Sequence, residues 1–255
     1  MSSAGCAVAV IGAGGLIGRA LLPQLGSRRG VRALDRQSDR VGGIHKVDAR
    51  RLKQLTKALR GCDVVVDLAA DAGWDASWER VYRNNILIVR TVLEASLRAG
   101  VTRVVHASSN QLMAGYEMDD PWAAVIAGRY DGLDPHDLPR LSVEAPPRPR
   151  SPYGAGKVFA ESACRWYSER HGLATVCLRI GTVLEPDRPR NSRHFATWLS
   201  HRDLGGFVDA AITAPATTEF AVGWAVSSNT WRIWEIADSQ ARLGYEPRDD
   251  AERWR

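Results

Sequence analysis

A chain of 255 residues that is 45% hydrophobic and 25% charged is long enough for a full α/β core in one domain. Its formal net charge of +5 comes mainly from arginines interleaved with acidic residues, a distribution that does not favour nucleic-acid binding. No apolar run approaches the roughly 20 residues that span a bilayer, and the N-terminus lacks a signal-peptide pattern. We therefore expect a cytoplasmic protein that binds neither nucleic acid nor membrane.

Cysteines and histidines give no sign of a disulfide or metal framework. The four cysteines, Cys6, Cys62, Cys164 and Cys177, are far apart and have no C-x-x-C spacing. They are typical of small core residues in a reducing compartment. The six histidines show no ligand spacing, so we expect no bound metal.

The first predicted elements form a dinucleotide-binding unit. A buried parallel strand over residues 6–12 leads into a glycine-rich turn and an amphipathic helix, and a second strand over 31–34 ends at Asp35. Glycines let the backbone approach a pyrophosphate, and a helix N-terminus offers unpaired N–H groups. The Asp35 carboxylate can accept from both hydroxyls of an adenosine ribose, which favours NAD over NADP. The neighbouring Arg36 would also accommodate a 2′-phosphate, which weakens that preference.

Later strands end in residues that suit a ligand at the carboxyl edge of a parallel sheet. The strand over 63–70 ends in Leu68, Ala69 and Ala70, and small side chains there allow close passage of a ribose. The strand over 103–107 leads to Ser108 and Ser109. A hydroxyl at this position lies in the crevice where open α/β sheets bind ligands.

A long helix predicted from residue 152 to a stop at Gly172 carries a pair of chemically useful side chains. Tyr153 and Lys157 are four residues apart and therefore share one helix face. A nearby ammonium favours the phenolate form of a tyrosine, which could take a hydroxyl proton while hydride leaves the same carbon. The alternative is a half-buried aromatic residue beside a solvated surface lysine.

Residues 115–150 interrupt the strand–helix rhythm with Asp-Pro, Leu-Pro and Pro-Pro turn sequences. Because a loop this long is usually functional or disordered, and this one ends just before Tyr153, we interpret it as a substrate lid. A sixth strand follows over 174–181.

The pattern Gly12-x-x-Gly15-x-x-Gly18 together with Tyr153-x-x-x-Lys157 resembles the extended short-chain dehydrogenase/reductase family, which includes NAD-dependent sugar epimerases and dehydratases. The resemblance implies an α/β fold, a Rossmann-type doubly wound parallel sheet with a small C-terminal substrate-binding lobe. It implies one domain over 1–255, with an NAD-binding core over 5–181, a substrate lobe over 182–255 and the insertion at 115–150. It also implies a catalytic triad of Ser109, Tyr153 and Lys157.

The resemblance further implies which residues meet the cofactor NAD. Asp48, after a third strand at 45–48, matches an acid that meets the adenine amino group, although a helix N-cap explains it equally well. Asn85, rather than Asn84, matches an asparagine that braces the site. The implied cofactor set is Gly12, Gly15, Leu16, Ile17, Gly18, Asp35, Arg36, Asp48, Leu68, Ala69, Ala70, Asn85, Tyr153, Lys157 and Ile180.

Within that family, five segments resemble the uronate dehydrogenases: 108–110, 178–181, Arg193, 197–203 and 243–247. Those enzymes oxidise C1 of a free hexuronic acid to an aldarolactone with NAD. The resemblance implies that Asn110 and Arg193 hold a substrate carboxylate, and arginine suits this because its planar fork donates two parallel hydrogen bonds. A surface arginine is the plainer alternative for Arg193. The implied substrate set is Ala72, Ser109, Asn110, Gln111, Tyr153, Thr182, Arg193 and Trp254.

Departures from the uronate dehydrogenase pattern keep other functions open. Gln111, Thr182, Ala72 and Trp254 replace residues of that pattern, so a related sugar acid or a larger glycoside is an alternative substrate. A nucleotide-sugar epimerase would use the same triad, and an NAD-sensing regulator is a third reading. Dehydration is disfavoured because Asn110 and Gln111 are neutral where dehydratases carry acid–base residues. We expect a small sugar or sugar-acid substrate and leave a homo-oligomer open.

Overall fold

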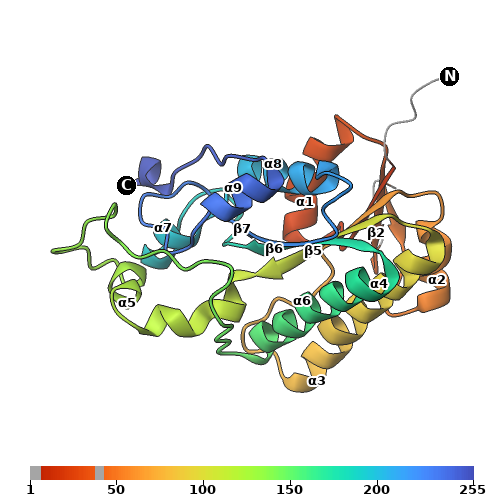
Figure 1. Cartoon of the computed structure of the whole chain (residues 1–255), viewed down its shortest axis with the longest axis horizontal. Coiled ribbons are helices and arrows are strands. Elements are labelled where there is room, and N and C mark those ends of the chain that lie inside the picture. The colour runs from red at the N-terminus through yellow and green to blue at the C-terminus, as the bar shows by residue number, and fades with distance from the viewer. Residues whose placement is uncertain (1–6, 38–42) are drawn as a thin grey trace.

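A parallel sheet of seven strands forms the centre of the computed structural model, which describes residues 7–37 and 43–255 (Figure 1). Its strand order is β3-β2-β1-β4-β5-β6-β7, so the chain winds outward in both directions from β1. This is the Rossmann-type doubly wound fold that the sequence predicts. The strands are β1 (Val8–Ile11), β2 (Val31–Asp35), β3 (Ile44–Lys46), β4 (Val64–Asp67), β5 (Arg103–Ser109), β6 (Ala174–Ile180) and β7 (Phe220–Ala225).

Helices cover both faces of the sheet, as parallel strands require. On one face lie α1, α8 and α9, and on the other lie α2, α4 and α6 (Figure 1). The helices are α1 (Leu16–Gly26), α2 (Leu52–Leu59), α3 (Trp78–Val81), α4 (Leu87–Ala99), α5 (Trp122–Ile126), α6 (Pro152–His171), α7 (Ser192–Thr197), α8 (His201–Thr213) and α9 (Ala237–Leu243). A π-helical turn, η1 (Tyr82–Ile86), and two 3₁₀ segments, η2 (Asn110–Met118) and η3 (Ala251–Trp254), complete the elements. In the described part of the chain, no helix is long and apolar enough to cross a membrane.

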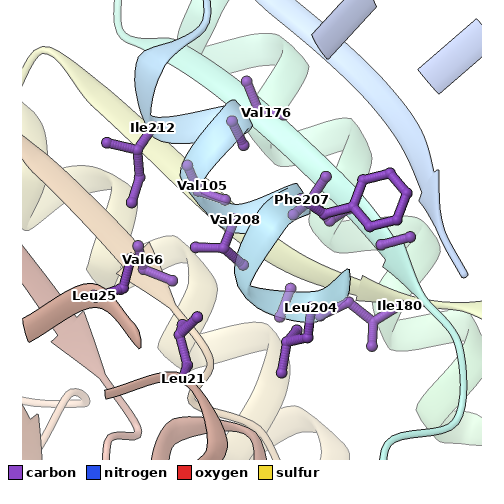
Figure 2. Close-up of a cluster of buried hydrophobic side chains, with 14 of the residues drawn as sticks. Leu21, Leu25, Val66, Val105, Val176, Ile180, Leu204, Phe207, Val208 and Ile212 are labelled. Atoms are coloured by element: carbon purple, nitrogen blue, oxygen red, sulfur yellow. The ribbon is translucent and has the colours of Figure 1, made fainter. Parts of the chain in front are cut away.

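Alternate residues of each central strand pack into two different hydrophobic cores, one on each face of the sheet. In β1, Val8 and Val10 face α1 and α8, whereas Ala9 and Ile11 face α2 and α4. Figure 2 shows the first core, with side chains of α1 and α8 gathered over valines of β4, β5 and β6. Because both faces are apolar, these strands appear in the sequence as continuous hydrophobic runs. Cys62, Cys164 and Cys177 are buried and free, and Cys6 lies outside the described residues.

Local sequence signals set both ends of helix α6. The Ser151 hydroxyl accepts a 3.1 Å hydrogen bond from the Gly154 N–H, and Pro152 occupies the first turn. At the other end Gly172 adopts a left-handed conformation, with φ at +67°, and its N–H donates to Ser168. The helix therefore begins and ends where the sequence predicts, and Tyr153 lies in its first turn.

Part of the region 182–255 extends the sheet and its helical cover. Strand β7 pairs with β6 along its whole length, and α8 packs on α1. These elements complete the Rossmann unit, although the sequence analysis assigned them to the substrate lobe. Helix α7 packs on both α5 and η3, away from α1 (Figure 1).

The segment 115–150 is packed into the protein, and its action as a substrate lid stays a prediction. It contains α5, and Leu141 forms a β-bridge with Trp234. Its apolar side chains share a third core with residues that follow β6, and the pair of Trp224 and Trp234 stacks at 4.3 Å between ring centroids. The sequence did not reveal this packing because the partners lie about a hundred residues further along the chain.

A buried ion pair joins α6 to the sheet below the first turns of that helix. Arg179 on β6 donates through Nε and Nη2 to the two oxygens of Glu161, at 3.0 and 2.9 Å. The Ser108 hydroxyl on β5 donates to the same carboxylate at 2.6 Å, and Arg179 also donates to the Val143 carbonyl at 2.9 Å. The network therefore links α6, two strands and the segment 115–150.

Replacing Glu161 by Gln should lower the free energy of unfolding by about 3 kcal/mol, because it leaves the buried Arg179 guanidinium without a counter-charge. Urea denaturation measures this change. The matched control is Glu169→Gln, which breaks a pair with Arg165 on the exposed face of the same helix and should cost under about 0.5 kcal/mol. Equal effects in the two variants would contradict the structural importance of the buried pair.

Candidate active site

Two adjoining pockets, each of about 450 Å³, lie at the carboxyl ends of the strands. They share Gly12, Gly15, Leu68, Ala70 and Ala72 and therefore form one elongated cleft. This cleft crosses the point between β1 and β4 where the strand order reverses, the usual ligand crevice of such sheets. The first pocket extends toward β2 and the second toward α6.

The glycine-rich turn forms the wall that the two pockets share. Gly12 has φ at +81°, and a Cβ on it would lie 2.9 Å from the Ala69 nitrogen, so only glycine fits between β1 and β4. A Cβ on Gly18 would collide with the Ala13 carbonyl. The absence of a side chain at Gly18 therefore lets α1 pack closely on the turn. Gly15 is the N-cap of α1, whose first N–H groups have no intrahelical partner. The turn can therefore receive an anion such as a pyrophosphate.

Asp35 lies in the first pocket at the end of β2. Its Oδ2 accepts from the Gly14 N–H at 3.1 Å, and its Oδ1 accepts from the Gln37 N–H at 3.0 Å. These bonds hold the carboxylate against the glycine turn, where remaining lone pairs are free to accept from ribose hydroxyls. Arg36 lines the same pocket.

Asp48 also lines the first pocket, but its carboxylate is already engaged. It accepts from the Arg50 backbone N–H at 3.0 Å and from the Arg50 guanidinium at 2.9 Å through each oxygen. The hydrogen bond from the Arg50 side chain holds the pKa of the Asp48 carboxyl below its usual value. Asp48 thus organises the turn before α2, and its contact with adenine stays a prediction.

Asn85 lies behind the cleft rather than in its lining. Its side-chain amide accepts from the Asp71 N–H at 2.9 Å and donates to the Asp71 carbonyl at 3.0 Å. The Asp71 carboxylate in turn pairs with Arg80, and both of these residues line the first pocket. Asn85 therefore fixes the backbone that follows β4, and sequence reasoning did not identify the Asp71–Arg80 pair.

Ser109, Tyr153 and Lys157 all line the second pocket. Lys157 is only 3% exposed, which rules out a solvated surface lysine, and its Nζ donates to the Ala107 carbonyl at 2.5 Å. The same Nζ lies 5.8 Å from the centre of the Tyr153 ring. The phenol and the amine therefore lie in one pocket, an arrangement that suits proton transfer to or from a bound hydroxyl.

Ser109 stands at the end of β5, where its Oγ accepts from the Gln111 N–H at 3.2 Å and caps η2. Next to it, Asn110 is 3% exposed and lines the pocket. Its Nδ2 has no hydrogen-bond partner among the residues that the structure describes. A buried amide donor without a partner is costly, so a ligand oxygen would relieve it.

A buried histidine supports the strands beneath Lys157. The Nδ1 atom of His106 lies 2.9 Å from Oδ2 of Asp67, and both side chains are almost fully buried. Burial lowers the pKa of His106, and the nearby Lys157 ammonium adds to this effect. The lowered pKa favours the neutral ring, and the contact through Nδ1 ties β5 to β4.

Most of the predicted substrate residues meet in the second pocket. Its lining includes Ala72, Ser109, Asn110, Gln111, Tyr153, Thr182 and Arg193. Trp254 is not part of that lining: it lies on η3 with 44% of its surface exposed, so its assignment from the C-terminal pattern has no support here. Trp74, which the sequence analysis did not single out, lines the pocket from the loop after β4.

Arg193 does not present a free fork to the pocket. Its Nε and Nη2 atoms each lie 2.7 Å from an oxygen of Glu117, and its Nη1 atom donates to the Thr182 hydroxyl at 3.3 Å. Glu117 comes from the end of η2, inside the segment 115–150. Sequence reasoning missed this partner because the two residues are separated by 76 positions. Across the described ranges 7–37 and 43–255, no cluster of three His, Cys, Asp or Glu side chains could hold a metal.

Comparisons with known proteins agree with this geometry. Residues 8–206 match the NAD dependent epimerase/dehydratase family. An L-arabinose 1-dehydrogenase (NAD(P)(+)) of Haloferax volcanii is 34% identical, with 96% of this chain and 97% of that protein covered. An NAD-dependent glucose-6-phosphate dehydrogenase of the same organism is 32% identical, covering 96% and 94%. The crystal structure of a uronate dehydrogenase from Agrobacterium tumefaciens superimposes with a TM-score of 0.81 at 27% identity, covering 98% of this chain and 86% of the other.

Replacing Asp35 by Ser should raise the KM for NAD and lower the KM for NADP, shifting the ratio of the two kcat/KM values at least about tenfold. The change removes charge-assisted hydrogen bonds to a ribose, worth about 1.5–3 kcal/mol, and the repulsion of a 2′-phosphate. Steady-state kinetics with each cofactor measures it. Asp209→Ser serves as the control, because Asp209 pairs with Arg28 and Arg29 outside both pockets. An unchanged ratio in the Asp35 variant would count against its contact with the ribose.

Proposed function

The chain belongs to the NAD-dependent epimerase/dehydratase family, and from this membership we propose that it is an NAD-dependent dehydrogenase that oxidises C1 of a sugar or sugar acid. The observation that carries the proposal is the meeting of Ser109, Tyr153 and Lys157 in a pocket continuous with the glycine-turn pocket. The relatives support it, since they are named as dehydrogenases of L-arabinose, glucose 6-phosphate and uronate. A cytoplasmic location and a homo-oligomeric state stay predictions from the sequence.

The cofactor would lie along the whole cleft. Asp35 would accept from the adenosine ribose, the turn from Gly12 to Gly18 would receive the pyrophosphate, and Ile180 would line the nicotinamide end. NAD supplies one chemical function when bound here, which is to accept a hydride from the substrate carbon. Lys157 would lie beside Tyr153 at this nicotinamide end of the cleft.

The reaction needs a base beside the hydroxyl that is oxidised. Tyr153 would take the proton of the C1 hydroxyl while the hydride leaves the same carbon, and a cyclic sugar would thereby become a lactone. Ser109 would donate a hydrogen bond to the reacting oxygen and hold it next to Tyr153. Lys157 is buried beside Tyr153 and would position that side chain.

A nucleotide-sugar epimerase is the second candidate, because it would use the same three residues. GDP-mannose 3,5-epimerases are among the relatives, although this chain covers only 38% of their length. The two functions differ in their products. An epimerase returns its NAD unchanged, whereas a dehydrogenase releases NADH.

The first test is therefore NADH formation by the purified protein with NAD and a panel of free aldoses, aldose phosphates and uronic acids. UDP- and GDP-sugars form the contrasting set, followed by chromatography of the sugar products. Net NADH from a free sugar supports the proposal. Interconversion of a nucleotide sugar without net NADH would establish the epimerase instead.

Replacing Tyr153 by Phe should reduce kcat about a thousandfold while NAD still binds, because only the proton acceptor is lost. Rapid kinetics and calorimetric titration of NAD measure the two quantities. Tyr167→Phe is a matched control on the same helix: Tyr167 is buried and bonded to Glu94, outside both pockets, so its loss should leave kcat nearly unchanged. Retained activity in the Tyr153 variant would show that another group is the base.

A further inference from the structure

The second pocket contains two charged side chains in its described lining, Lys157 and Arg193. Lys157 is buried, bonded to the Ala107 carbonyl and directed toward Tyr153. Arg193 is thus the one cation of that lining that could meet a charged group at the far end of a sugar. Its electrostatic state decides whether the pocket attracts an anionic or a neutral substrate.

Glu117 neutralises this cation. The pair is bidentate, with both N–O distances at 2.7 Å, and it uses the Nε–Nη2 edge of the guanidinium, one of the two edges that match a carboxylate. The Glu117 side chain is only 9% exposed, and that of Arg193 is 25% exposed. Water therefore screens the pair poorly, and the Glu117 charge offsets the attraction of Arg193 for a second carboxylate.

The position of Glu117 is fixed by its surroundings. Two residues earlier, the Gly115 N–H donates to the Arg148 carbonyl at 2.7 Å, and a Cβ on Gly115 would clash with Arg148. The neighbouring Tyr116 donates to the Pro146 carbonyl at 3.1 Å and packs edge-on against Trp122. The backbone just before Glu117 is therefore held in place, and the carboxylate lies against Arg193, which lines the pocket.

We propose that Glu117 is a specificity-determining residue that makes an uncharged aldose the substrate of this enzyme and disfavours uronates and sugar phosphates. The inference rests on the proposed function and deepens it. It replaces the expectation that Arg193 holds a substrate carboxylate. Apart from Lys157, the rest of the pocket wall is uncharged and offers hydrogen bonds suited to sugar hydroxyls.

Three neutral side chains supply those hydrogen bonds. The Asn110 amide nitrogen has no partner within the described part of the chain, and Gln111 lies beside it in the lining. The Thr182 hydroxyl is oriented by Arg193 and by the Thr197 hydroxyl at 2.8 Å. Glu117 thus also positions Thr182, because it fixes the guanidinium that contacts it.

Matched sugars give a direct test. L-Arabinose, D-galactose and D-galacturonate share the ring configuration from C1 to C4 and differ at C5, which carries hydrogen, CH₂OH or a carboxylate. The wild-type enzyme should show a kcat/KM for the better neutral sugar at least tenfold above that for galacturonate. Glucose against glucose 6-phosphate and glucuronate extends the comparison to a second ring configuration and a second anion.

Glu117→Gln should reverse the discrimination, because it frees the charge of Arg193 while keeping a side chain of the same shape. The ratio of kcat/KM for galacturonate to that for the neutral sugar should rise at least tenfold. The control is Glu144→Gln in the same segment, where Glu144 is 75% exposed and pairs with Arg242 outside the second pocket. That variant should leave the ratio unchanged.

The outcomes separate this inference from the proposed function. A wild-type enzyme that prefers galacturonate, or a folded Glu117→Gln variant with an unchanged ratio, overturns the inference while the dehydrogenase stands. No NADH from any free sugar, with NAD still bound, overturns the proposed function itself. If the Glu117→Gln variant does not fold, the wild-type kcat/KM ratios decide whether the inference holds. Calorimetry then provides a second measurement, the affinities of the NAD-loaded wild type for galactose and galacturonate.

Discussion

The polar face of helix α6 organises the site, because Tyr153, Lys157 and Glu161 recur every four residues and point at the sheet. The last of them forms the buried ion pair with Arg179 and accepts from Ser108, which anchors the helix to β5 and β6. Burying an unpaired charge would cost several kcal/mol, so the pair permits essentially one position of the helix. That position sets the ammonium of Lys157 on the β5 backbone and the phenol of Tyr153 over the pocket.

The same sheet edge brings together two chemically different halves. Around the glycine turn the cleft offers backbone N–H groups and the Asp35 carboxylate, which suit a pyrophosphate and a ribose. Around Tyr153 it offers a buried phenol and neutral hydrogen-bonding groups. The two halves meet at Gly12, where only the absence of a side chain lets the turn approach Ala69. A long bound cofactor can therefore reach from one half to the other.

Predictions from the sequence were correct where a structural feature depends on residues within one short segment. The Rossmann-type sheet followed from apolar runs and the glycine turn, and the ends of α6 followed from Ser151 and Gly172. The packing of the segment 115–150 was not predicted. Its prolines are typical of turns, and the partners of its apolar residues lie after β6. The contact assigned to Trp254 came from alignment of a C-terminal pattern, and the structure leaves that side chain on the surface.

The sequence by itself determined the fold class, the cofactor turn and the pairing of Tyr153 with Lys157, because each depends on residues within a few positions of one another. Only the tertiary structure decided the charge of the substrate pocket. From the sequence, Arg193 is predicted to hold a substrate carboxylate. In the structure its guanidinium instead pairs with Glu117, which lies 76 positions earlier in the chain. No local pattern encodes that contact, because it exists only after the segment 115–150 has packed against the carboxyl edge of the sheet.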